Sequence, residues 1–265
     1  MSSIITLTSD WGTDDYFVAA FKGQLLRFVP SATVIDISHH INPFDIMHAA
    51  YILRNSYKFF ADNTIHLIGV DCIRVKTVDA AGNFPRRIVA VEKNNQIFIG
   101  PDSGLFNNLF TDGYDYAYEM ISYRELNRLK LNEFFISCCY KLLRGEKLIE
   151  IGNITDSLMI SYPRTPSRTG DGIAGHVEFI DRFGNAITNI SQRFFEENCN
   201  EREFELFINS KISINKFSQY YDEEETGEVV AMWNSSGVLE LALNTGRMDK
   251  LIGLKKDSTI RIVFK

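Results

Sequence analysis

TLTSDWGTDD, residues 6–15, places an acidic turn directly after the first apolar run of the chain. A helix-like stretch follows at residues 16–28, with apolar residues three or four positions apart. In an open α/β sheet, ligands bind in the crevice at the carboxyl ends of the strands. Asp10 would lie there, where its carboxylate could accept two hydrogen bonds from a sugar diol. Alternatively, Asp10 and Thr13 only form the turn and cap the helix.

The composition sets broad limits on the fold and partners. The chain has 265 residues, of which 45 % are apolar, enough for a core in one large domain or two modest ones. The net charge of −6 argues against a nucleic-acid or anionic membrane partner. No apolar run is long enough to span a bilayer, and no secretion signal is visible. The four cysteines and five histidines lack metal-ligand spacing. We therefore expect reduced thiols, no metal and a cytoplasmic protein.

Two textures of sequence predict two domains. Strand-like and helix-like segments alternate over residues 1–162, which predicts an α/β domain with a largely parallel sheet. Residues 163–172 hold two prolines and two glycines and are typical of a linker. Short alternating runs over residues 173–265 predict a smaller all-β, barrel-like domain.

Several polar clusters of the first domain follow expected strands. In residues 42–45, either Asp45 caps a helix or Phe44 forms an aromatic wall for a ligand. Asp71 ends an expected strand, which places it at the crevice beside Asp10. Arg86 and the next arginine are by default a solvated pair. Residues 100–104 are expected to form a structural turn.

Two turns of the second domain are rich in polar side chains, although no Gly-rich cofactor fingerprint occurs anywhere in the chain. Residues 180–189 form either a plain hairpin or a pocket, in which Phe183 could stack on a base and Asn185 could match the edge of adenine. Residues 234–237 include Ser235 and Ser236; this turn could hold a carboxylate, or it could simply connect two strands.

Five segments in order resemble the S-adenosylmethionine (SAM) hydroxide adenosyltransferases, relatives of the fluorinase and chlorinase enzymes. They are Ser-Asp-Trp-Gly at 9–12, Asp-Ile-Ser-His at 36–39, Gly-Pro-Asp-Ser-Gly-Leu at 100–105, the turn at 180–189, and Ser-Ser-Gly-Val-Leu-Glu-Leu-Ala at 235–242. The resemblance implies a homotrimer with SAM as substrate and no separate cofactor. SAM would lie between the first domain of one subunit and the second domain of its neighbour.

The resemblance also implies roles for individual residues. The implied substrate-binding residues are Asp10 on the ribose hydroxyls, Phe44 beside the ribose, Phe183 and Asn185 on adenine, and Asp181 with Ser235 on the methionine amine and carboxylate, with Ser236 in the same turn. An Asp, an Arg and a His orient water in the hydrolytic members. Asp71 matches that Asp and Arg86 that Arg, but Lys130 stands where the His should be.

Three hypotheses follow. The first is adenosyl transfer to water, giving adenosine and methionine, with Asp71, Arg86 and Lys130 around the water. The second is a SAM or adenosine sensor of the same fold that has lost catalysis. The third is a halide-using enzyme, which is disfavoured because Leu131 stands where the halogenases carry a small hydroxyl residue.

Overall fold

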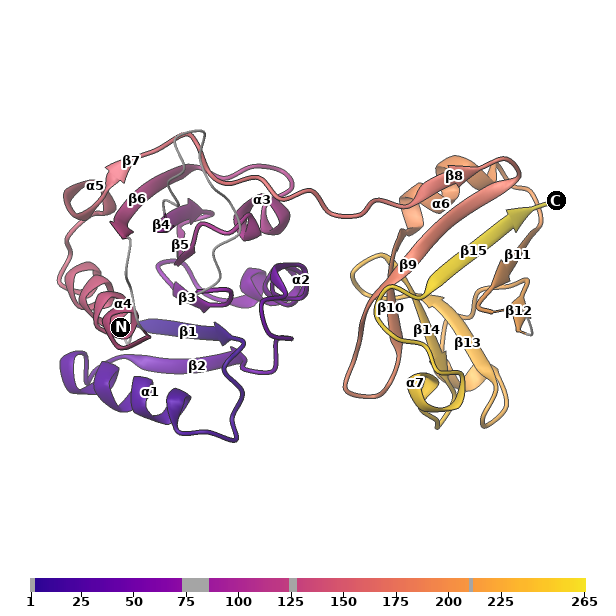
Figure 1. Cartoon of the computed structure of the whole chain (residues 1–265), viewed down its shortest axis with the longest axis horizontal. Helices are drawn as coiled ribbons and strands as arrows, with labels where there is room; N and C mark the ends of the chain where they lie inside the picture. The colour runs from indigo at the N-terminus through magenta and orange to yellow at the C-terminus, as the bar shows by residue number, and fades with distance from the viewer. Residues whose placement is uncertain (1–2, 73–85, 124–127, 210–211) are drawn as a thin grey trace. The chain divides into compact units, whose positions relative to one another are not determined.

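The computed structural model describes residues 3–72, 86–123, 128–209 and 212–265 (Figure 1). The chain divides into two compact units, Met1–Tyr162 and Pro163–Lys265. In the described part of the chain, no helix combines the length and apolar character needed to cross a membrane.

Seven strands and five α-helices are described in the first unit. They are β1 (Ile4–Ser9), α1 (Phe17–Phe28), β2 (Thr33–Ser38), α2 (Ile46–Ser56) with a 3₁₀ turn at Tyr57–Phe59, β3 (Ile65–Gly69), β4 (Arg86–Lys93), β5 (Gln96–Pro101), α3 (Leu105–Leu109), β6 (Tyr116–Tyr123), α4 (Arg128–Leu143), α5 (Leu148–Ile151) and β7 (Asn153–Ile154).

The strands form one sheet in the order β2-β1-β3-β5-β4-β6-β7. Strands β2, β1, β3 and β5 are parallel, which confirms the predicted parallel sheet. Strand β4 runs antiparallel between β5 and β6. A tight hairpin joins β4 to β5, and its residues Asn94 and Asn95 both have positive φ, at 53° and 58°.

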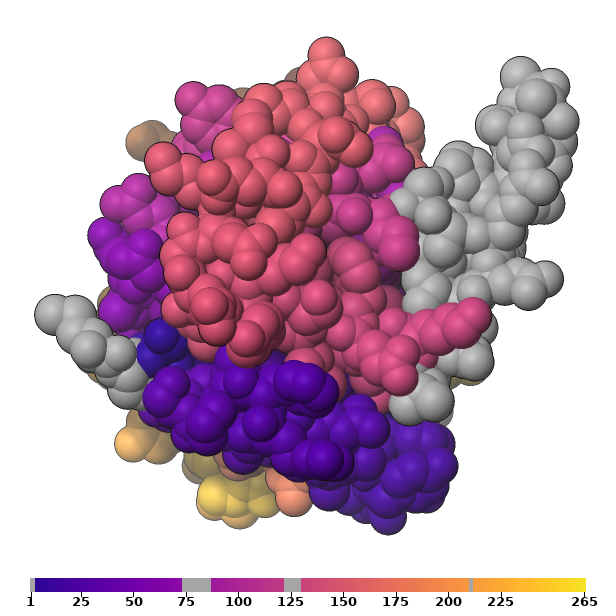
Figure 2. Space-filling view, turned by 90° about the vertical axis from the view of Figure 1, so that its left-hand side faces the viewer, coloured from indigo at the N-terminus to yellow at the C-terminus, as the bar shows by residue number. Residues whose placement is uncertain are grey.

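Helices cover both faces of this sheet. On one face, Phe21 and Leu25 of α1 and Phe135 of α4 pack against the alternate apolar residues of β1 and β3. On the other face, α2 and α3 pack against Ile68 and Val89. Figure 2 shows one side of the molecule, where the indigo surface of the α1 region adjoins the pink surface of later residues of this unit. The result is the three-layer arrangement typical of α/β domains.

The second unit is antiparallel and barrel-like, as predicted. Its elements are β8 (Ser167–Thr169), β9 (Gly172–Ile180), β10 (Ala186–Ser191), α6 (Gln192–Cys199), β11 (Phe204–Phe207), β12 (Ser213–Ile214), a 3₁₀ turn at Tyr221–Glu223, β13 (Val229–Trp233), β14 (Val238–Leu243), α7 (Met248–Leu251) and β15 (Thr259–Phe264). The sheet order is β12-β11-β15-β9-β10-β14-β13, with β8 paired to β9. The segment expected to be a linker therefore contains strand β8.

Candidate functional site

The loops that follow β1, β2 and β3 lie at one edge of the first sheet. These three strands are parallel neighbours, so their carboxyl ends meet at the same edge. The loops carry Asp10, Phe44 and Asp71, three of the residues predicted to form the site.

Asp10 connects the three loops through one oxygen. Its Oδ2 accepts hydrogen bonds from the backbone N–H of Phe44 at 2.9 Å and of Asp71 at 3.3 Å. Both donors have left-handed backbones, with φ of 64° and 54°. Such conformations cost energy in non-glycine residues and are enriched at functional sites. Oδ1 of Asp10 accepts no hydrogen bond from the described residues.

Both interpretations of residues 42–45 are compatible with the structure. Asp45 caps α2, because its Oδ1 accepts a hydrogen bond from the backbone N–H of His48 at 3.2 Å. Phe44 keeps 43 % of its surface exposed beside Asp10. The alternative role of Thr13 as a helix cap is wrong. Helix α1 has no side-chain cap, and Oγ1 of Thr13 lies 3.3 Å from Nε2 of His40.

The strand order brings two further predicted residues to the same edge. Strand β4 runs opposite to β5, so Arg86 begins at the edge where β5 ends. Strand β6 runs parallel to β5, and α4, with Lys130 exposed in its first turn, follows β6. The side chain of Arg86 and the loop at 73–85 lie outside the described residues. Leu131, the next residue of α4, is 3 % exposed and packs in the core.

Arg87 is not the solvated residue expected by default. Its guanidinium binds Asp102 at 2.7 Å and Glu119 at 3.0 Å, and it also donates to the carbonyl of Ser157. Burial lowers the pKa of Arg87, but the two carboxylates outweigh burial and raise it above its ordinary value. Asp102 belongs to the turn at 100–104, which is therefore structural, as expected.

The turn at 181–185 in the second unit is held by its own side chains. Both carboxylate oxygens of Asp181 bind Asn185: Oδ1 accepts the backbone N–H at 2.8 Å, and Oδ2 accepts Nδ2 at 3.3 Å. Gly184 has φ of 90°, and a Cβ there would lie 2.6 Å from Oδ1 of Asp249. Phe183 projects from this turn with 76 % of its surface exposed.

Glu240 joins this turn to two other segments, and sequence reasoning did not identify it as a site residue. It is 5 % exposed and accepts hydrogen bonds from Nδ2 of Asn185 at 2.9 Å, from the Tyr221 hydroxyl at 2.7 Å and from Nδ2 of Asn234 at 3.3 Å. A carboxylate in the middle of the apolar strand β14 was the available signal. Asp181 and Glu240 both accept hydrogen bonds from Nδ2 of Asn185, so its amide is held from two sides.

The turn at 234–237 lies next to this cluster. Oδ1 of Asn234 accepts the backbone N–H of Ser236 at 3.0 Å, which fixes the turn. Ser235 is exposed and Ser236 is half-buried. The structure therefore gathers Asp181, Asn185 and the 234–237 turn around Glu240, within the second unit.

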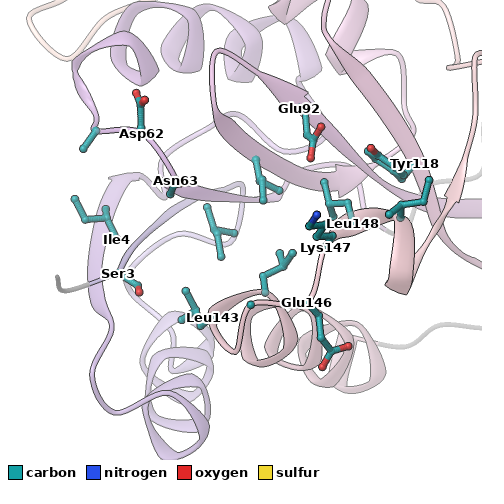
Figure 3. Close-up of a pocket in the computed structure, with 16 residues that line it drawn as sticks. Ser3, Ile4, Asp62, Asn63, Glu92, Tyr118, Leu143, Glu146, Lys147 and Leu148 are labelled. Carbon is teal, nitrogen blue, oxygen red and sulfur yellow. The ribbon is translucent and has the colours of Figure 1, made fainter.

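A cavity of about 680 Å³ lies at the opposite edge of the first sheet, where the parallel strands begin. Figure 3 shows Ser3 and Ile4 on one side of it and Glu92 and Tyr118 on the other. None of the residues predicted to form the site lines it. The described residues also contain no group of three or more His, Cys, Asp or Glu side chains arranged to hold a metal.

Two matches to family models show what class of protein this is. The N-terminal domain model of the SAM hydroxide adenosyltransferases matches residues 5–152, and the C-terminal domain model matches residues 175–261. The chain belongs to the SAM hydroxide adenosyltransferase family.

Individual relatives extend over almost the whole chain. An (R)-S-adenosyl-L-methionine hydrolase of Methanocaldococcus jannaschii is 28 % identical, covering 98 % of this chain and 96 % of that protein. A fluorinase of an Actinoplanes species is 25 % identical, covering 98 % and 97 %. The fold is similar to that of an uncharacterized conserved protein from Thermotoga maritima, with a TM-score of 0.81 at 24 % identity over 98 % of this chain and 99 % of the other.

Proposed function

We propose that this protein transfers the adenosyl group of SAM to water, giving adenosine and L-methionine. The observation that carries the proposal is the carboxylate of Asp10, which holds three strand-end loops together and keeps Oδ1 available at the edge where an α/β sheet binds ligands. Membership of the family and the full-length similarity to proteins named as SAM hydrolases support it.

In this proposal, each unit binds one part of SAM. Asp10 accepts hydrogen bonds from the ribose hydroxyls, and Phe44 covers the sugar. In the second unit, Phe183 stacks on adenine, and Oδ1 of Asn185 accepts a hydrogen bond from its exocyclic amine. Asp181 faces the methionine ammonium, and the 235–236 turn donates hydrogen bonds to its carboxylate. The subunits form a homotrimer in which neighbouring chains complete each site.

The chemistry requires little beyond placement of the nucleophile. The leaving group is neutral methionine, because the reacting sulfur of SAM is a sulfonium. Asp71 would orient a water molecule in line with the ribose C5′, while Arg86 and Lys130 supply positive charge that favours its deprotonated form. Water delivers the hydroxyl that becomes the 5′-OH of adenosine and releases one proton.

The test is to incubate the purified full chain with SAM and to measure adenosine and methionine by chromatography. We expect equal amounts of both. The isosteric variant Asp71→Asn should lower kcat by at least ~100-fold and leave the affinity for adenosine within a few-fold. Asp62→Asn, an exposed carboxylate at the opposite edge of the sheet, is the matched control and should behave like the unchanged protein.

The outcomes separate the hypotheses. An unchanged rate in Asp71→Asn would show that Asp71 does not orient the water. Binding of SAM without turnover would establish the sensor alternative, which the replacement of the family histidine by Lys130 motivates. Absence of binding to SAM and adenosine would exclude both. A chloride- or fluoride-containing nucleoside product would establish the halide alternative. The burial of Leu131 argues against that alternative.

A further inference from the structure

Four polar side chains form a continuous chain that ends next to Asp10. Oγ of Ser9 lies 2.7 Å from Nδ1 of His39, and Nε2 of His39 lies 3.1 Å from Oδ1 of Asp36. Oδ2 of Asp36 accepts a hydrogen bond from Nζ of Lys22 at 2.5 Å. This row of contacting side chains thus runs from α1, across β2, to the last residue of β1. Neither the proposed water site nor the proposed substrate contacts include any of its members.

The His39 ring contacts Asp36 through one nitrogen and Ser9 through the other. Burial raises the pKa of Asp36, but its contacts with Lys22 and His39 outweigh burial, so that the pKa lies below its ordinary value. Nε2 of His39 lies 3.1 Å from Oδ1 of Asp36 without the alignment of a hydrogen bond, so this contact is electrostatic. Oγ of Ser9 and Nδ1 of His39 share one hydrogen bond, and the tautomer of the ring decides which of the two atoms donates. The oxygen of the Ser9 hydroxyl also accepts a hydrogen bond from the backbone N–H of Trp11 at 3.4 Å.

His39 also holds the other side of the same turn. Its carbonyl oxygen accepts a hydrogen bond from the backbone N–H of Gly12 at 2.8 Å. The side chain of His39 therefore holds the residue before Asp10, and its backbone holds the turn two residues after Asp10. Because a carboxylate swings with the backbone that carries it, these contacts set the direction in which Asp10 points.

A nucleophilic role for Ser9 does not fit the burial, although the order Ser-His-Asp resembles a catalytic triad. Ser9 and His39 are only 2 % and 3 % exposed. A substrate cannot reach the serine oxygen at that depth. The next residue, Asp10, is half-buried, and its Oδ2 is already bound to two backbone amides.

We propose that the Lys22–Asp36–His39–Ser9 chain is a positioning device that aims Oδ1 of Asp10 at the cis-diol of a ribose. This inference rests on the proposed function, because it takes the nucleoside part of SAM as the ligand. It assigns Ser9 and His39 to selectivity for the diol and not to the reaction with water.

The matched pair Ser9→Thr and Ser9→Val tests the device. Threonine and valine have nearly the same shape, and only threonine keeps the hydroxyl. A small cavity of about 10 Å³ lined by Ser9, Trp11 and Phe135 gives part of the room for the added methyl. Calorimetry would measure the Kd of adenosine and of 2′,3′-dideoxyadenosine, which lacks the diol, for the full chain and for each variant.

The unchanged protein and Ser9→Thr should both prefer adenosine over the dideoxy compound by at least ~10-fold, the worth of one or two hydrogen bonds to a charged group. Ser9→Val should lose most of that preference through weaker adenosine binding, with dideoxyadenosine affinity nearly unchanged. Thr64→Val is the control. It removes a buried hydroxyl that donates to the carbonyl of Ala61 at 2.7 Å, at the start of β3, and should keep the preference.

The results separate failure of the device from failure of the function. If the unchanged protein binds no adenosine, the proposed function fails and the inference falls with it. If the unchanged protein prefers adenosine but Ser9→Val keeps that preference, or Thr64→Val loses it, only the device is wrong. If Ser9→Val does not fold, Lys22→Met decides. This substitution removes the contact between Lys22 and Asp36 at the exposed end of the row of side chains, and it should reduce the preference for adenosine several-fold. An unchanged preference would overturn the inference.

Discussion

His66 lies in the middle of β3 with no exposed surface, between Oγ1 of Thr6 at 2.7 Å and Oε1 of Gln96 at 3.0 Å. Burial lowers its pKa from 6.5 to about 4, although the hydrogen bond with Gln96 raises it in part. The folded state therefore holds the neutral ring, whereas the unfolded chain takes up a proton near pH 6.5.

The sign of the pH dependence follows from this difference. Between pH 6.5 and about 4 the unfolded chain binds the extra proton, so the free energy of unfolding should fall as the pH is lowered, by up to about 3 kcal/mol from this group. Urea unfolding from pH 7.5 to 4.5 measures the slope. His66→Gln should be less stable at pH 7 and show a smaller slope in this window. An equal slope in both proteins would assign the dependence to other groups.

Sequence alone could place Asp10 and Asp71, because a polar residue directly after a buried strand lies at the carboxyl edge of a parallel sheet. It could not show that one oxygen of Asp10 ties down Phe44, since that contact spans 34 positions of the chain and depends on a left-handed backbone. Glu240 was missed for a related reason. Its partners come from three separate segments, and strand periodicity only marks it as an anomaly.

Strand β4 is antiparallel to both of its neighbours in the first sheet, and Arg87 joins it to the residues around it. The guanidinium binds Asp102 after β5 and Glu119 on β6. Removing it leaves the carboxylate of Asp102, whose side chain is 3 % exposed, without its cation.

We expect Arg87→Met to lower the free energy of unfolding of the first unit by about 3 kcal/mol. Arg87→Lys should lose less, since lysine keeps the charge but not the fork of donors. Denaturant titration followed by circular dichroism measures both. Arg193→Met, which breaks an exposed i,i+4 pair with Glu197 on α6, is the control and should change little. A loss in Arg87→Met no larger than in the control would contradict the expectation.

The predicted alternation of strands and helices is confirmed from β1 to β3, where the apolar periods are clear. Strand β6 was not predicted, and the antiparallel position of β4 was not foreseen. The residues of β6 mix tyrosines, a glutamate and a methionine without clean alternation. Its pairing with β4 is a long-range contact that local periodicity does not encode.

In the proposed homotrimer a neighbouring subunit would complete each site, and mixing two inactive variants tests this. Asp10→Ala should disable the first unit and Asn185→Ala the second. If the subunits are denatured together in equal amounts and refolded, random assembly should restore about a quarter of the sites in a ring of subunits, because each site then needs an intact first unit from one variant and an intact second unit from the other.

The measurement is SAM turnover in the refolded mixture, compared with each variant refolded alone. Light scattering on the same samples reports whether trimers form. Recovery of activity in the mixture supports sites shared between chains. Trimers without recovery would show that each site lies within one chain, and monomers that are active without variants would exclude the shared arrangement altogether.

The two backbone hydrogen bonds to Asp10 have a consequence for how fast a ligand is captured. Phe44 after β2 and Asp71 after β3 are both hydrogen-bonded to Asp10 after β1, so the positions of these three residues are set when the chain folds. A nucleoside that binds Asp10 requires no rearrangement of Phe44 and Asp71 around it. Its association rate should therefore follow encounter by diffusion, and differences in affinity among ligands should appear as differences in residence time.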